Sequence, residues 1–104
     1  MDEHEAQQAR YRAERAKMLN ILAARIKALR KKRGYKSQES FGEAVNLHRT
    51  YIGCLERGER EPSTSVLLIL AEKLEVPFDE LLEDLPVPIE RRPTPRRKDA
   101  TRGP

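Results

Sequence analysis

The sequence has few of the residues that build a large core, a disulfide or a membrane segment. It has no tryptophan, two phenylalanines and three tyrosines among 104 residues, so the core must be small and aliphatic and would gain from dimerisation. Its single cysteine excludes an intramolecular disulfide, which suits a reducing compartment. No apolar run approaches the ~20 residues that span a bilayer, and the N-terminus is charged and alanine-rich. We therefore expect a soluble cytoplasmic protein without a membrane partner.

Patterns that carry catalysis or metal binding are also missing. The sequence contains no paired catalytic carboxylates, no nucleophile beside a base and no phosphate-binding loop. Its two histidines, His4 and His48, belong to no cluster of cysteines and histidines of the kind that binds zinc. We therefore expect no enzyme activity, no cofactor and no metal.

Charge is abundant and unevenly distributed. Residues 19–34 carry six basic side chains and no acidic one, whereas residues 58–84 carry eight acidic and two basic ones. The last segment, residues 85–104, is basic again. Such polarity suits a protein that docks one face on phosphates while its acidic part faces away. A solvated surface with uneven charge is the alternative interpretation.

The most informative stretch is QESFGEAVNLHRTYIGCLER, which predicts two short helices joined by a tight turn. Apolar residues one helical turn apart direct residues 38–45 and residues 49–57 at a shared core. Asn46 stands where the chain must leave the first helix in a left-handed conformation, which asparagine tolerates. Gly42 has no side chain, so the second helix can cross close to the first. This geometry is that of a helix-turn-helix, whose second helix reads the DNA major groove.

From here the sequence resembles the lambda-repressor-like (Xre-type) helix-turn-helix family. The resemblance covers residues 19–82 and is carried by SQESFGEAV, LHRTYIGCLERGEREPS and LLILAEKLEVPFDELL in that order. The LHRTYI run is also similar to the controller proteins of restriction–modification systems. The family usually has alanine at the position of Gly42 and glycine at that of Asn46. The resemblance implies an all-α, five-helix domain over residues 19–84. Composition adds a helical N-terminal extension (residues 1–18), which has no glycine or proline, and a disordered basic tail (residues 85–104), which is rich in proline.

The helix predicted over residues 49–57 would enter the major groove by its N-terminal residues. Arg49 is the natural bidentate donor to a guanine, and Thr50 can reach a base edge or a thymine methyl group. Tyr51 would reach a phosphate through its hydroxyl group. Cys54 lies deeper along the same face, either as a contact or redox sensor or as a tolerated small residue.

Residues on either side of this helix complete the expected DNA contacts. Ser37 is the predicted N-cap of the preceding helix, and Gln38 lies at its positive end, which can face a phosphate. His48 or the turn beside it caps the reading helix. The resemblance places Arg57 and Arg60 against the phosphate backbone, although Arg57 could instead be a cation at the helix C-terminus.

The first helix of the domain is predicted over residues 19–34. Leu19, Leu22, Ile26 and Leu29 recur at steps of three and four and form its buried stripe. The resemblance further implies that Arg30 pairs with Glu56 of the reading helix. This ion pair would be structural and not a DNA contact.

The fourth and fifth helices are predicted to begin at Pro62–Ser63 and at Pro77. The fourth has a core stripe and a second apolar edge formed by Val66 and Ile69, which predicts burial on two sides. This edge could pack on a partner chain, on the N-terminal helix or within an overpacked monomer core. In the family the last helix often makes the dimer contact. The predicted homodimer interface therefore comprises Val66, Ile69, Phe78, Leu81, Leu82 and Leu85.

We interpret the chain as a sequence-specific DNA-binding transcriptional regulator, a repressor or autoregulator, that binds a palindromic operator as a homodimer. The alternative is an antitoxin-like protein-interaction module with autoregulatory DNA binding. A protein partner would then bind the N-terminal extension or the basic tail. The extension and the tail could equally be solvated segments, and the tail could add nonspecific DNA affinity.

Overall fold

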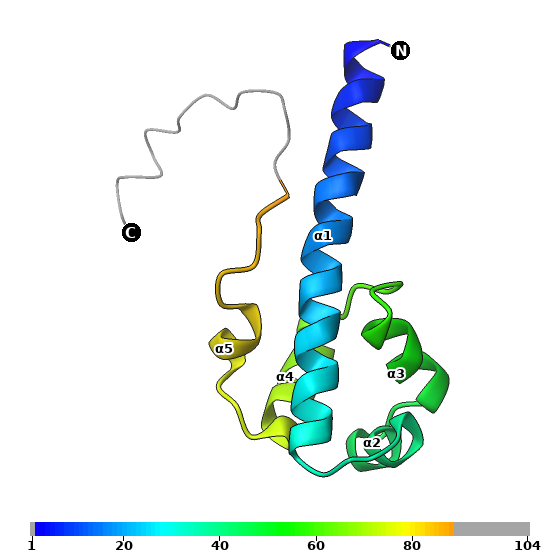
Figure 1. Ribbon diagram of the computed structural model, residues 1–104, viewed down its shortest axis with the longest axis vertical. Coiled ribbons are helices and arrows are strands. Elements are labelled where there is room, and N and C mark those ends of the chain that lie inside the picture. The colour runs from blue at the N-terminus through cyan, green and yellow to red at the C-terminus, as the bar shows by residue number, and fades with distance from the viewer. Residues whose placement is uncertain (1, 89–104) are drawn as a thin grey trace.

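A computed structural model describes residues 2–88 as five helices without a strand (Figure 1). The helices are α1 (Glu3–Lys32), α2 (Gln38–Val45), α3 (Arg49–Glu56), α4 (Thr64–Leu74) and α5 (Phe78–Leu82). Figure 1 shows α1 as a long axis with α2 and α3 on one side and α5 on the other. The predicted all-α fold is confirmed. In this part of the chain no helix is long and apolar enough to cross a membrane.

The N-terminal extension and the predicted first helix are one continuous helix. Asp2 caps α1 by accepting a hydrogen bond from the Glu5 amide, and the Glu5 side chain accepts one from the Asp2 amide in return. The helix passes residue 18 without a break and ends at Lys32, followed by the C-cap Arg33 and by Gly34 with a φ of +93°. Only its second half is buried, at Leu19, Leu22, Ala23, Ile26 and Arg30. The first half extends beyond the core.

The core is one aliphatic cluster with a single phenylalanine at its centre. Each of the five helices contributes to it, as expected for a small domain without tryptophan. The largest fully buried side chains are Phe41, Ile26, Ile52, Leu70, Leu74 and Leu81. Tyr35 packs on Phe41 from outside the cluster, with ring centroids 5.1 Å apart.

The later helices differ slightly from their predicted bounds. Helix α3 ends at Glu56 and not at residue 57 as predicted, because the backbone of Arg57 already has the conformation of a C-cap residue. The fourth helix begins at Thr64, where Ser63 caps it by accepting from the Val66 amide at 3.2 Å. Pro77 is the N-cap of the fifth helix.

One predicted interface residue belongs to the core. Leu81 is fully buried within its own chain, so it has no surface to offer a second copy, and its inclusion in the interface was wrong. Four other predicted interface residues are partly buried against the core, namely Val66, Phe78, Leu82 and Leu85. Ile69 keeps 42% of its surface exposed, and its neighbour Leu68, which was not predicted, keeps 51%.

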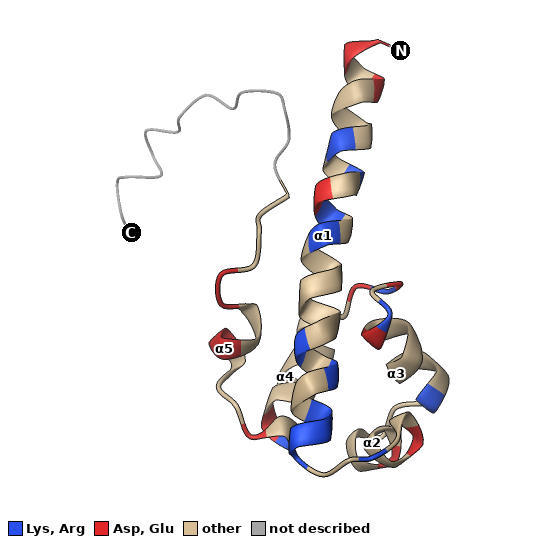
Figure 2. Cartoon of the chain, in the orientation of Figure 1, with Lys and Arg blue, Asp and Glu red and all other residues tan. Residues whose placement is uncertain are grey.

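Three of the six basic side chains in residues 19–34, all of them arginines, bind groups within the protein. Arg25 donates to the Leu81 carbonyl at 2.9 Å, and Arg33 donates to the Leu74 carbonyl at 2.7 Å. Each arginine thereby satisfies carbonyl groups near the C-terminus of another helix, where a cation is favoured. Figure 2 shows the acidic residues around α5 on the other side of α1 from α3. The basic segment therefore has less free charge for phosphates than the sequence indicated.

Residues 89–104, which form most of the predicted basic tail, lie outside the described residues. The predictions made for that tail stay predictions. The described residues before it, 85–88, follow α5 without forming a helix.

Candidate nucleic-acid interface

The turn between α2 and α3 has the geometry that the sequence predicted. Asn46 ends α2 in the left-handed region, with φ 60° and ψ 43°. The Leu47 amide then donates to the Gly42 carbonyl at 2.8 Å. A Cβ atom on Gly42 would lie 2.4 Å from the Leu47 carbonyl oxygen, closer than packed atoms allow. The turn therefore folds back directly over α2, and glycine leaves it room to do so.

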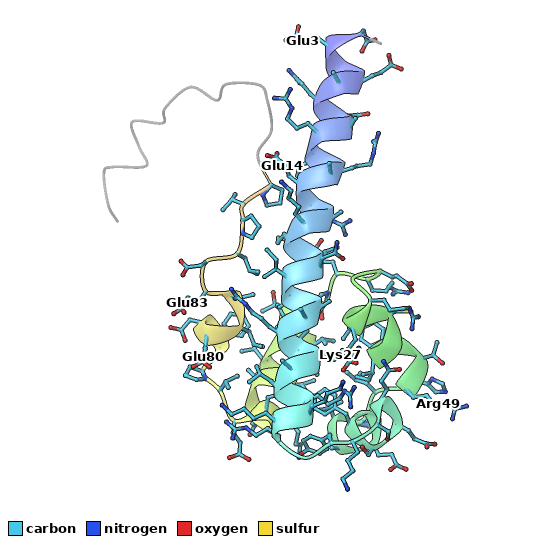
Figure 3. All side chains as sticks on the ribbon, viewed as in Figure 1. Glu3, Glu14, Lys27, Arg49, Glu80 and Glu83 are labelled. Carbon is cyan, nitrogen blue, oxygen red and sulfur yellow. The ribbon has the colours of Figure 1, made fainter. Side chains whose placement is uncertain are left out.

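The side chain of His48 caps the start of α3. His48 is the extended N-cap of α3, and its Nδ1 accepts a hydrogen bond from the Thr50 amide at 3.0 Å. This bond satisfies one of the amides that a helix N-terminus leaves without a partner. The next two residues, Arg49 and Thr50, are exposed at the tip of α3. In Figure 3, Arg49 points outward from the edge formed by α2 and α3, on the side of the molecule away from Glu80 and Glu83.

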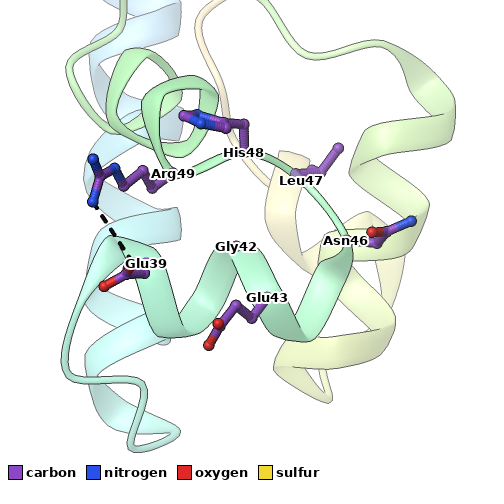
Figure 4. A pocket seen from close by; sticks show the side chains of 7 residues that line it. All are labelled: Glu39, Gly42, Glu43, Asn46, Leu47, His48 and Arg49. Carbon is purple, nitrogen blue, oxygen red and sulfur yellow. Dashed lines mark ion pairs between the residues drawn. The ribbon is translucent and has the colours of Figure 1, made fainter.

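Arg49 has an acidic neighbour on α2. Its Nη1 lies 3.6 Å from Oε2 of Glu39, and about two thirds of each side chain is exposed. Figure 4 shows this pair among the residues that line an open pocket beside the turn. The pocket is lined by Glu39, Gly42, Glu43, Asn46, Leu47, His48 and Arg49. One carboxylate, that of Glu39, thus lies beside the predicted base-reading arginine, and Glu43 lines the same pocket without an ion pair to it.

The inner side of α3 is held by a buried polar network. Arg30 donates to both carboxylate oxygens of Glu56, through Nε at 2.6 Å and Nη2 at 3.2 Å. It also donates through Nη1 to the Tyr35 carbonyl at 2.8 Å. Gln38 adds a bond from its side-chain amide to Glu56 at 3.1 Å. The first residue of α2 and the last of α3 are thereby tied to α1.

The residues expected to contact phosphate at the start of α2 are engaged locally. Ser37 accepts from the Ser40 amide at 2.9 Å, and its own amide donates to the Ser40 hydroxyl at 3.3 Å. Gln38 is half-buried, with its amide group turned inward to Glu56. A phosphate at this helix end would therefore meet backbone amides of the first turn more than these side chains.

The loop after α3 contains two arginines with different surroundings. Arg57 donates to both carboxylate oxygens of Glu59, at 2.8 and 3.2 Å, and to Cys54 Sγ at 3.7 Å. The hydrogen bond from Arg57 lowers the pKa of Glu59. Arg60 instead stacks over Tyr51, with its Cζ atom 5.6 Å from the ring centroid. Arg60 is the freer of the two cations.

Several acidic partners were not anticipated from the sequence. Glu39 pairs with Arg49, Glu59 with Arg57, and Glu61 with Arg15 of the N-terminal half of α1, at 2.8 Å. The Arg57–Glu59 pair is close in sequence and could have been suspected. The other two pairs join separate elements, so only their packing brings them together. Within residues 2–88, no group of His, Cys, Asp or Glu side chains could hold a metal ion.

Comparisons with known proteins agree with this geometry. A family model described as "Helix-turn-helix" matches residues 26–81. The control protein C.SmaI of Serratia marcescens is 44% identical over 62 residues, which cover 60% of this chain and 73% of that protein. The uncharacterized HTH-type transcriptional regulator YazB of Bacillus subtilis is 39% identical over 61 residues, 59% of this chain and 87% of YazB. The crystal structure of the restriction-modification controller protein C.AhdI from Aeromonas hydrophila has a TM-score of 0.57 and 36% identity, and the match covers 61% of this chain and 94% of C.AhdI.

Proposed function

Since this chain belongs to the helix-turn-helix family of DNA-binding transcription regulators, we propose that it binds a palindromic operator as a homodimer and regulates transcription from it. The observation that carries this proposal is the exposure of Arg49 and Thr50 at the tip of a helix whose inner side is buried. A helix that contacts bases must be held rigidly on its buried face and carry polar side chains on its exposed face, because base contacts require fixed positions. The Arg30–Glu56 pair supplies that rigidity.

Recognition would divide between base contacts and phosphate contacts. Arg49 would donate to the two acceptors of a guanine, and Thr50 would contact an adjacent base edge. Arg60, the Tyr51 hydroxyl and the first amides of α2 would hold the phosphates on either side. Arg57 is already neutralised by Glu59, so it contributes less in this proposal than the resemblance implied.

The proposed dimer would form through the exposed edge of α4 and the segment after it. Ile69 has the largest exposed fraction among the predicted interface residues, and Leu68 beside it extends the apolar surface. Val66, Phe78, Leu82 and Leu85 would border this contact. Two copies joined in this way would present their α3 helices to successive major grooves, ~34 Å apart.

The similarity to control proteins of restriction–modification systems supports a more specific role. We propose that the chain controls its own promoter in the manner of such a regulator. This proposal needs no separate sensing domain, because a monomer–dimer equilibrium makes binding depend on the concentration of the protein.

The first experiment is a gel shift on DNA from upstream of its own gene, with excess random competitor at physiological salt. A discrete complex that survives competition, with two protected half-sites about one helical turn apart, is expected. A complex that the competitor abolishes would contradict sequence-specific binding. The N-terminal half of α1 would then be used as bait for a protein partner.

The dimer is tested by sedimentation of the whole chain and two variants. Ile69→Asp is expected to shift the protein toward monomer and to weaken operator binding. Ile21→Asp is the matched control, because Ile21 is 40% exposed but lies on α1, outside the proposed interface. An Ile69→Asp protein that associates as wild type does would contradict this interface.

A further inference from the structure

The shortest contact between the Glu39 carboxylate and Arg49 is made by one terminal nitrogen of the guanidinium group. The pair joins Nη1 to Oε2 at 3.6 Å, and about two thirds of both side chains remain exposed. Because the guanidinium group is a planar fork with five donors, a contact at Nη1 leaves the edge formed by Nε and Nη2 directed elsewhere. In Figure 4, Glu39 lies on the first turn of α2 and Arg49 at the start of α3, with the side chains of both lining the pocket.

The position of Arg49 at a helix N-terminus explains why a neighbouring carboxylate stabilises its charge. Arg49 is the first residue of α3, where the positive end of the helix dipole disfavours a cation. Glu39 lies in the first turn of α2, where an anion is favoured. A salt bridge between such exposed groups contributes little to stability, so removing the charge of Glu39 should leave the fold intact.

We infer that Glu39 is a specificity-determining residue that holds Arg49 for a guanine and withholds it from phosphates. This inference rests on the proposed function. At a guanine, the Nε–Nη2 edge meets two acceptors in the bidentate geometry that this base offers. Elsewhere on DNA, Arg49 stays neutralised by Glu39, and the carboxylate repels the phosphate backbone. Specificity is a difference of affinities, so weakening the contacts with random DNA increases it.

The test compares two single substitutions on the same helix. Glu39→Gln and Glu43→Gln each remove one exposed negative charge from α2, and both residues line the same pocket. Among the described ion pairs, only Glu39 contacts Arg49. Glu43→Gln therefore controls for the general effect of one charge. The measurement is the dissociation constant for the operator and for a random duplex over a series of salt concentrations.

For Glu39→Gln we expect tighter binding to the random duplex, with a salt slope steeper by about one. The ratio of operator to random affinity should fall roughly tenfold, the order of one bidentate base contact. Glu43→Gln should tighten binding to both DNAs similarly and leave the ratio near that of wild type. In an Arg49→Ala background the two glutamine variants should behave alike. Circular dichroism of each variant verifies that the helical content is unchanged.

Two outcomes would overturn the inference. One is an equal change of the affinity ratio by Glu39→Gln and Glu43→Gln. The other is an effect of Glu39→Gln on the ratio that persists when Arg49 is alanine. Failure of the proposed function looks different, because the wild-type chain itself would then show no preference for any operator over random DNA.

Discussion

Arg30 of α1 and Glu56 of α3 meet in a two-point ion pair whose side chains are only 4% and 1% exposed. The pair ties the last residue of the reading helix to the longest helix of the protein. Gln38 and the Tyr35 carbonyl complete its hydrogen bonds, and no buried side-chain polar atom in the described residues lacks a partner. A buried pair of this kind is costly to break, because one charge is then left without compensation.

Glu56→Gln should therefore destabilise the fold strongly. We expect a loss of about 3–5 kcal/mol in the free energy of unfolding, since Arg30 keeps its charge in a site without a counterion. The measurement is urea unfolding followed by circular dichroism. Glu61→Gln is the control, because it breaks the exposed Arg15–Glu61 pair and should cost less than ~1 kcal/mol. Similar losses for both variants would contradict a special role for the buried pair.

Gly42→Ala should destabilise the protein although alanine favours helices. Alanine gains up to about 1 kcal/mol over glycine inside a helix, but the added Cβ would lie 2.4 Å from a backbone oxygen of the turn. Gly53→Ala is the matched control within α3. Its Cβ would meet only side-chain ends, at 3.0 Å, which can move. We expect a lower melting temperature for Gly42→Ala than for Gly53→Ala. A lower melting temperature for Gly53→Ala than for Gly42→Ala would show that the turn can move to accommodate the added methyl group.

Arg49→Ala should reduce operator affinity by about 1–3 kcal/mol and relax the preference at one base pair. The reason is the loss of a bidentate contact that random DNA does not provide. The measurement is binding to an operator set with each base pair substituted in turn. An equal loss on operator and random DNA would remove Arg49 from the base-reading residues.

Arg60→Ala should weaken binding to operator and random DNA alike, because phosphates are common to both. The slope of affinity against salt should become less steep by about one. Arg60→Lys separates charge from stacking on Tyr51, since lysine keeps the charge but not the planar group. The slope should be retained in Arg60→Lys. An unchanged slope in Arg60→Ala would argue against a phosphate contact.

The Arg57–Glu59 pair predicts a pH effect with a definite sign. The hydrogen bond from Arg57, with its positive charge, holds the pKa of Glu59 below the ordinary 4.5. A lowered pKa in the folded state means that the pair stabilises the fold above pH 4.5 and that this contribution is lost as the pH falls through the folded pKa. NMR titration should show the lowered pKa in wild type and its return to the ordinary value in Arg57→Gln. Arg60→Gln should leave it lowered, and a return there too would point to a general field effect.

Local patterns predicted the helix-turn-helix closely. The bounds of α2 came out as predicted, because Ser37 caps one end and Asn46 adopts the left-handed conformation at the other. The start of α3 and the apolar residues that face the core also followed from spacing alone. These features depend on neighbours within a few residues, so the sequence contains what is needed to find them.

The destinations of charged side chains were much harder to predict. The sequence predicted that Arg25 and Arg33 belong to a basic docking surface. In the structure, both donate to carbonyl groups of helices that are far away in the sequence. Leu81 was predicted to lie in the dimer interface, but it is buried in the core. The partner of each of these residues depends on which helices pack together. Periodicity assigns a residue to one face of its helix, but it does not identify the element that packs on that face.

The sequence by itself determined the all-helical fold, the caps at Ser37 and Ser63, the turn at Asn46 and the family to which the chain belongs. Only the tertiary structure decided that Arg25 and Arg33 bind carbonyl groups of other helices and that Glu39 lies beside Arg49. The physical reason is the distance along the sequence over which the interactions act. Caps and helical stripes arise from interactions within one or two turns, whereas ion pairs between elements depend on how the packed core orients those elements.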